Sequence, residues 1–140
     1  MVKMRQNKNS GFTLIELLVV LVLISLLAGL VGPKLFNQLG SSKTKVANAQ
    51  VELLSSAIKT YRLDTGELPT TEQGLNALMI EPDNVVGWNG PYLSKSIPQD
   101  PWNRDYRYEL MPNYEFKLYS YGRDGEKGGE GEDADIGTQE

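Results

Sequence analysis

The feature that most restricts the fold of this 140-residue chain is an apolar segment near its N-terminus. Residues 12–32 read FTLIELLVVLVLISLLAGLVG, and Glu16 is the only charged residue among them. At ~1.5 Å of rise per residue, a helix of this length covers ~30 Å, the hydrocarbon thickness of a bilayer. The segment therefore predicts a membrane-spanning helix and leaves the remaining residues to build one small domain.

Two other interpretations of this segment are a cleaved secretory signal peptide and a plain membrane anchor. Lys3, Arg5 and Lys8 supply the basic start of a signal peptide, but the apolar run exceeds the usual ~7–15 residues and no A-x-A-like cleavage site follows it. In an anchor, the same basic residues would hold the N-terminus in the cytoplasm and send the rest of the chain across the membrane.

Glu16 distinguishes these interpretations. An acidic residue in a membrane helix costs ~2.5–3.5 kcal/mol near the bilayer centre and less near the interface, so it indicates function. If the chain were cut between Gly11 and Phe12, the new α-amine of Phe12 would lie about one helical turn from Glu16. That amine could pair with the carboxylate, either within the chain or in a neighbouring subunit.

The composition excludes most enzyme classes. The chain contains no histidine and no cysteine, which rules out Ser-His-Asp and Cys-His nucleophile systems, the usual zinc sites and disulfides. A calculated pI near 4.9 argues against nucleic acid as a main partner. We expect a structural protein. A membrane-tethered hydrolase with Asp100 and Asp105 as a carboxylate pair is an alternative without a pocket signature.

The residues around the predicted cut carry a family resemblance. Residues 8–17, KNSGFTLIEL, resemble the processing site of the type IV pilin and pseudopilin superfamily. The resemblance implies that a prepilin peptidase removes the leader after Gly11 and methylates the new N-terminus at Phe12. It also implies that Glu16 pairs with the N-terminal amine of an adjacent subunit during assembly.

Beyond the membrane segment, the sequence predicts that the helix continues with an amphipathic face. Pro33 predicts a kink, and Gly40 to Ser42 is a possible soft point. Apolar residues then recur at three- and four-residue spacing up to Tyr61, and Gly66 offers a C-terminal cap. The expected parts of the chain are a leader (1–11), a membrane and filament-core helix (12–33), its amphipathic continuation (34–66) and a small domain (67–140).

Local patterns predict the elements of that small domain. Thr70 and Gln73 have the spacing of a capping box, which indicates a short helix through Met79. Apolar and polar residues alternate over 106–110 and 114–118, with Met-Pro-Asn between them, as in an antiparallel hairpin. The predicted fold class is α+β, with a long N-terminal helix packed on a small antiparallel sheet.

Further motifs narrow the resemblance to one branch. Residues 68–78 (LPTTEQGLNAL), 98–102 (PQDPW), 120–125 (SYGRDG) and 133–137 (DADIG) resemble the major pseudopilin of type II secretion systems. Two positions depart from that pattern. Arg104-Asp105 stands where a glycine-containing turn is commoner, and Thr138-Gln139 replaces a frequent Asn-Trp pair.

The acidic, glycine-rich tail is the one candidate site in the small domain. Residues 122–140 hold seven acidic and two basic residues with six glycines. Composition alone fits a solvated tail or a Ca²⁺ loop. The EF-hand pattern is absent, because counting from Asp124 puts Gly128 at the fifth position and Asp135, not glutamate, at the twelfth. The resemblance implies one Ca²⁺ in a loop over 120–137. Its ligands would be the carboxylates of Asp124 and Asp135 and backbone carbonyls near Tyr121, Glu126 and Glu132, with Asp133 as a ligand or a neighbouring charge.

The resemblance also implies a function and a location. The processed chain would polymerise into the helical periplasmic pseudopilus that drives export of folded proteins across the outer membrane. Its partners would be copies of itself, minor pseudopilins, the prepilin peptidase and an inner-membrane assembly platform, with the small domain in the periplasm. The alternative is a type IV pilus subunit for adhesion or DNA uptake, which usually carries a C-terminal disulfide loop that this cysteine-free chain cannot form.

Overall fold

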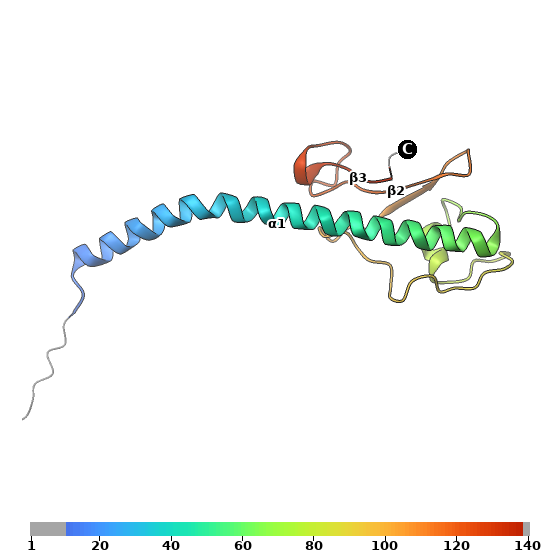
Figure 1. The fold of residues 1–140 in the computed structure, drawn as a ribbon, viewed down its shortest axis with the longest axis horizontal. Helices are drawn as coiled ribbons and strands as arrows, with labels where there is room; N and C mark the ends of the chain where they lie inside the picture. The colour runs from blue at the N-terminus through green and yellow to red at the C-terminus, as the bar shows by residue number, and fades with distance from the viewer. Residues whose placement is uncertain (1–10, 139–140) are drawn as a thin grey trace, which may run out of the picture. The chain divides into compact units, whose positions relative to one another are not determined.

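The structure is a computed structural model that describes residues 11–138 (Figure 1). Its elements in chain order are α1 (Leu14–Thr65), the 3₁₀ helix η1 (Gly74–Leu78), β1 (Arg107–Leu110), β2 (Phe116–Ser120), the 3₁₀ helix η2 (Gly131–Asp133) and β3 (Ile136–Gly137). The chain divides into an N-terminal unit up to Gln38 and a C-terminal unit from Leu39 onward. The basic residues of the predicted leader lie outside the described residues.

The N-terminal unit consists of the first half of α1, whose apolar side chains are exposed. Leu14, Leu21 and Leu30 are 89%, 64% and 79% exposed, and the most apolar 18-residue window has a mean hydropathy of 3.0 with none of it buried. A helix that is apolar on all sides fits a lipid environment. The Ser25 hydroxyl donates to the Leu21 carbonyl at 2.8 Å, so this polar group is satisfied within the helix.

The helix α1 continues through Pro33, so the proline does not end it. The kink predicted at this residue stays a prediction. The helix is also uninterrupted at Gly40, the predicted soft point. Gly40 is buried, and a Cβ there would overlap the carboxylate of Glu132, so this glycine lets the C-terminal loop approach the helix closely.

The C-terminal unit is built on one face of α1 between Leu39 and Thr65. That face and the antiparallel sheet, ordered β1-β2-β3, enclose the core (Figure 1). Its buried apolar residues are Ala47, Val51, Leu54, Ala57, Ile58, Tyr61, Leu68, Leu75, Ala77, Leu78, Leu93, Tyr106, Tyr108, Leu118 and Ile136. The predicted α+β class, with a long helix on a small antiparallel sheet, is confirmed.

Two local predictions are confirmed in detail, and a third is corrected. The helix ends at Thr65, and Gly66 follows with φ +81° and an N–H that donates to the Arg62 carbonyl at 2.9 Å. The Thr70 N–H donates to Gln73 Oε1 at 2.9 Å, and the Gln73 N–H donates to Thr70 Oγ1 at 3.1 Å, which forms the capping box. The helix predicted to run through Met79 is a 3₁₀ helix that ends at Leu78, with Met79 as its C-cap.

The predicted hairpin is present, with one correction and one addition. Tyr108 pairs with Leu118 across β1 and β2, and both residues face the core. Tyr114 was expected to continue the inward alternation, but it lies in the turn with φ +57° and is 72% exposed. The sequence also gave no signal for β3, a two-residue strand in which Ile136 pairs with Ser120.

Candidate functional site

The first candidate site surrounds Glu16 at the start of α1. The N–H and hydroxyl of Thr13 both donate to Glu16 Oε2, at 2.7 and 2.9 Å, and the Glu16 N–H donates back to Thr13 Oγ1 at 3.3 Å. This reciprocal arrangement is a capping box, with Thr13 as the N-cap. The carboxylate that makes this segment unusual is therefore satisfied by its own chain.

The partner role of Thr13 is a feature not predicted from the sequence, although its signal is present there. Thr13-Leu14-Ile15-Glu16 has the same spacing as the capping box recognised at Thr70 to Gln73. The predicted cleavage bond lies just before this box. Gly11 and Phe12 are exposed and precede the helix, and Phe12 is 84% exposed. An exposed bond outside the helix is accessible to a peptidase.

The second candidate site is the loop between β2 and β3. It contains glycines with left-handed backbone angles at positions 122, 125, 128, 129 and 131. Because only glycine adopts these angles without strain, the glycine-rich composition serves to reverse the chain several times. The pairing of Ser120 with Ile136 then brings the two ends of the loop together.

Asp124 and Asp135, the predicted carboxylate ligands, both lie in this loop. Asp124 Oδ1 accepts a hydrogen bond from the Glu126 N–H at 3.0 Å, and Asp135 Oδ1 accepts one from the Gly128 N–H at 3.1 Å. Within residues 11–138, the second oxygen of each carboxylate accepts no hydrogen bond. Each aspartate therefore stabilises a turn of the loop and retains one oxygen for another partner.

Asp133 is held by Arg123. The guanidinium donates to Asp133 Oδ1 at 2.8 Å from Nε and to Oδ2 at 2.9 Å from Nη2. Glu132 Oε1 lies 3.8 Å from Nη1, and the Glu132 carbonyl accepts the Arg123 N–H at 2.8 Å. The hydrogen bonds to Asp133 raise the pKa of Arg123. Of the two predicted roles for Asp133, this geometry favours a neighbouring charge over a metal ligand.

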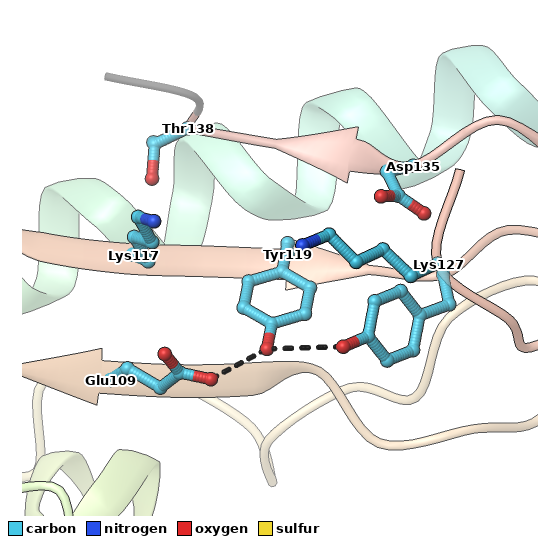
Figure 2. A pocket seen from close by; sticks show the side chains of 7 residues that line it. Glu109, Lys117, Tyr119, Lys127, Asp135 and Thr138 are labelled. Atoms are coloured by element: carbon cyan, nitrogen blue, oxygen red, sulfur yellow. Dashed lines mark hydrogen bonds between the residues drawn. The ribbon is translucent and has the colours of Figure 1, made fainter.

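Among the described residues, no three acidic side chains gather as a metal cluster. That observation leaves the calcium prediction untested. The predicted shell takes only two side-chain carboxylates, from Asp124 and Asp135, and its other oxygens are backbone carbonyls. Asp135 also lines a cavity of about 610 Å³ over the sheet. Figure 2 shows its lining, where the Tyr119 hydroxyl donates to Glu109 at 2.6 Å. Lys127 is another residue of this lining.

Asp100 anchors the loop to the rest of the C-terminal unit, a role that the sequence analysis missed. It is 3% exposed, and its Oδ1 accepts the N–H groups of Trp102 at 3.0 Å and Arg104 at 2.9 Å. Its Oδ2 accepts the hydroxyl of Ser120, the last residue of β2. These contacts use the carboxylate for structure. Asp105 is exposed and accepts a hydrogen bond from Gln99, so the two aspartates have separate partners.

Comparisons with known proteins identify the family of this chain. A family model described as type II secretion system protein G matches residues 34–139, and a prokaryotic N-terminal methylation motif matches residues 6–32. The chain belongs to the protein G family of type II secretion systems. The family assignment supports the secretion branch, and not the surface-pilus alternative.

Relatives of this family member match along most of its length. The core protein G of Pseudomonas aeruginosa is 40% identical over 140 residues, which cover 96% of this chain and 98% of the relative. The core protein G of Vibrio cholerae is 41% identical over 139 residues, covering 96% and 94%. Both relatives are named core proteins of a type II secretion system.

A solved structure supports the fold. The major pseudopilin of the type 2 secretion system of enterohaemorrhagic Escherichia coli is similar, with a TM-score of 0.59 and 30% sequence identity, over 76% of this chain and 94% of that one. Together with the apolar helix and the methylation motif, this likeness identifies a membrane-anchored secretion-system subunit of the pseudopilin type.

Proposed function

We propose that this chain is the subunit that polymerises into the pseudopilus and drives export of folded proteins across the outer membrane. The observation that carries the proposal is a fully exposed apolar helix joined to a unit with its own core. Such a helix is stable in lipid or against copies of itself. The same apolar surface would therefore contact lipid in the membrane and neighbouring helices at the centre of a filament. Head-to-tail contacts that do not close into a ring produce filaments.

The proposed location is the inner membrane, with the C-terminal unit in the periplasm. Lys3, Arg5 and Lys8 precede the apolar segment, and basic residues at this position favour retention of the N-terminus in the cytoplasm. A prepilin peptidase would cut the exposed bond between Gly11 and Phe12. The inner-membrane assembly platform and the minor pseudopilins are the further partners that the proposal requires.

Glu16 would change partner during assembly. In the described chain its carboxylate accepts hydrogen bonds from Thr13, which lowers the cost of placing an acid in the membrane. After cleavage, the amine of Phe12 on a neighbouring subunit would offer a full positive charge. Because an ion pair is stronger in an apolar surrounding, this contact would favour the filament over the isolated subunit.

Complementation of a strain that lacks the native copy tests this function. The parent chain should restore secretion and yield filaments that can be sheared from the cells, whereas Glu16→Ala should be inserted in the membrane and assemble poorly. Glu52→Ala, which alters an exposed acid on the same helix, is the matched control. Normal secretion without any copy would refute the function, and normal filament yield from Glu16→Ala would refute the pairing.

We also propose that Ca²⁺ binds the loop over 120–137. Asp124 and Asp135 each retain a carboxylate oxygen, and the left-handed glycines turn the backbone so that carbonyls near Tyr121 and Glu126 can join them. An all-oxygen donor set of this kind suits Ca²⁺. When bound, the ion would supply a positive charge that ties the two aspartates together; its role would be structural.

Calcium removal is the test of this site. At free calcium about 100 times the dissociation constant, binding should stabilise the folded full-length chain by about 2.7 kcal/mol relative to chelator, seen as a higher melting temperature in detergent. Asp124→Ala should remove that increment, and Glu130→Ala, an exposed acid of the same loop, should keep it. Identical melting curves of the parent with Ca²⁺ and with chelator would refute the site.

A further inference from the structure

The side chain of Arg104 lies against the loop over 120–137. Its Nη1 donates to the carbonyl of Gly122 at 2.7 Å and to the carbonyl of Arg123 at 2.8 Å. Both acceptors lie just after β2, where the backbone enters the loop. Charge-assisted hydrogen bonds of this kind are shorter and about twice as strong as neutral ones.

The loop is shaped around this guanidinium. A Cβ at Gly125 would lie 2.8 Å from Arg104 Cζ, closer than side-chain carbons approach one another, and Gly125 has φ +75°. The glycine therefore serves two purposes at once, because it adopts a left-handed angle and leaves room for the arginine. The contact extends from Gly122 to Gly125, which is the first turn of the loop.

The position of Arg104 is fixed by the buried Asp100. The Arg104 N–H donates to Asp100 Oδ1 at 2.9 Å, and the Asp100 N–H donates to the Arg104 carbonyl at 2.8 Å. Because Asp100 also accepts the Ser120 hydroxyl, the turn that carries the arginine and the strand that enters the loop share one anchor. The guanidinium is thus held beside its carbonyl acceptors by contacts within the chain.

We propose that Arg104 acts as a built-in cation that holds the loop over 120–137 closed without a bound metal ion. The inference rests on the proposed calcium loop only for the prediction that Ca²⁺ adds further stability. The positive charge of Arg104 attracts the carbonyl oxygens at the loop entrance. The Arg123–Asp133 ion pair joins two segments farther along the loop. A subunit braced in this way keeps its loop ordered when calcium is scarce.

Amide hydrogen exchange of the full-length chain in detergent tests the proposal. A peptide that covers 120–137 is followed by mass spectrometry in chelator and in Ca²⁺, for the parent and for Arg104→Met. In chelator the parent loop should stay protected, and the loop of Arg104→Met should exchange about tenfold faster, since two charge-assisted hydrogen bonds are lost. Arg104→Lys keeps the charge and should give an intermediate rate.

Two controls separate this result from general damage. Lys95→Met removes an exposed positive charge outside the loop and should exchange like the parent. A peptide that covers 107–118 should keep its protection in Arg104→Met, which shows that the sheet is still folded.

The outcomes separate the brace from the calcium site. Equal loop protection in the parent and Arg104→Met in chelator overturns the proposal, as does a parent loop that is unprotected until Ca²⁺ is added. Ca²⁺ should slow exchange in Arg104→Met more than in the parent. If Ca²⁺ changes neither protein while Arg104→Met still exchanges faster, the brace stands and the calcium site fails.

Discussion

The two ends of α1 place the same residue type in opposite surroundings. Leu21 is 64% exposed, whereas Leu54, on the same helix, is fully buried between the helix and the rest of the C-terminal unit. The N-terminal unit therefore depends on an apolar phase that the chain does not supply, and the C-terminal unit supplies its own. Local helical structure is common to both, so burial is what distinguishes a part that can change environment from one that cannot.

Two carboxylates, one exposed and one buried, extend this comparison. Glu16 accepts hydrogen bonds from Thr13, three residues away, so both groups belong to the same helical turn. Asp100 accepts hydrogen bonds from Trp102, Arg104 and the distant Ser120, so it holds separate segments together. Glu16, whose hydrogen bonds are local, suits a helix that changes its surroundings. Asp100, whose partners include a residue far along the chain, stabilises the tertiary structure.

The largest expected effect is on the core face of α1. Leu54→Ala should lower the free energy of unfolding of the C-terminal unit by about 4 kcal/mol, because a fully buried leucine leaves a cavity. Leu21→Ala should leave that free energy unchanged. Chemical denaturation of the full-length chain in detergent measures both, and a similar loss in the two variants would contradict the contrast between the two ends of the helix.

The next largest effect is expected at Asp100. Asp100→Ala leaves the Ser120 hydroxyl and two backbone N–H groups without their acceptor, which should cost about 3 kcal/mol of unfolding free energy. Asp105→Ala removes an exposed aspartate with one side-chain partner and should change it by less than about 0.5 kcal/mol. Equal melting temperatures for the two variants would show that Asp100 is not an anchor.

The two capping boxes allow a smaller, matched test. Thr70→Val should destabilise the C-terminal unit by about 1 kcal/mol, because the Gln73 N–H in the turn before η1 loses its hydroxyl acceptor. Thr13→Val should leave its melting temperature unchanged and instead speed amide exchange in the first turn of α1. A drop in melting temperature for Thr13→Val would mean that the two units are energetically coupled.

The smallest effect at neutral pH concerns Tyr108. Burial raises the pKa of its hydroxyl, which donates to the Pro69 carbonyl at 2.7 Å, to about 12. Since the folded-state pKa is raised, this contribution to stability is complete below about pH 10 and is lost as the pH rises towards 12. Tyr108→Phe should flatten the alkaline decline in unfolding free energy, and Tyr114→Phe, at an exposed position, should not.

The sequence predicted the features that depend on neighbouring residues. The end of α1 at Gly66, the capping box at Thr70 and the hairpin all follow from spacings of a few residues, as does the exposed apolar segment. The missed features depend on residues far apart in the chain. Nothing near Asp100 indicates that Ser120 will donate to it, and β3 forms only because the loop returns Ile136 to the edge of β2.

The candidate sites divide in the same way. Glu16 was predicted because a lone acid in an apolar run is costly, and its partner Thr13 could have been found from the capping-box spacing. The predicted ligands Asp124 and Asp135 lie in one loop, but the pairing of Asp133 with Arg123 and the placement of Arg104 depend on how the loop folds back. Composition indicated an acidic loop without indicating which charges are already paired.

The intact mass of the chain recovered from native membranes tests whether it is processed as a pseudopilin and not as a secreted protein. We expect a protein that begins at Phe12, carries the added mass of one methyl group and retains the whole apolar segment through Gly32. A mass that includes residues 1–11, or one that begins after the apolar segment as a cleaved signal peptide would give, would contradict it.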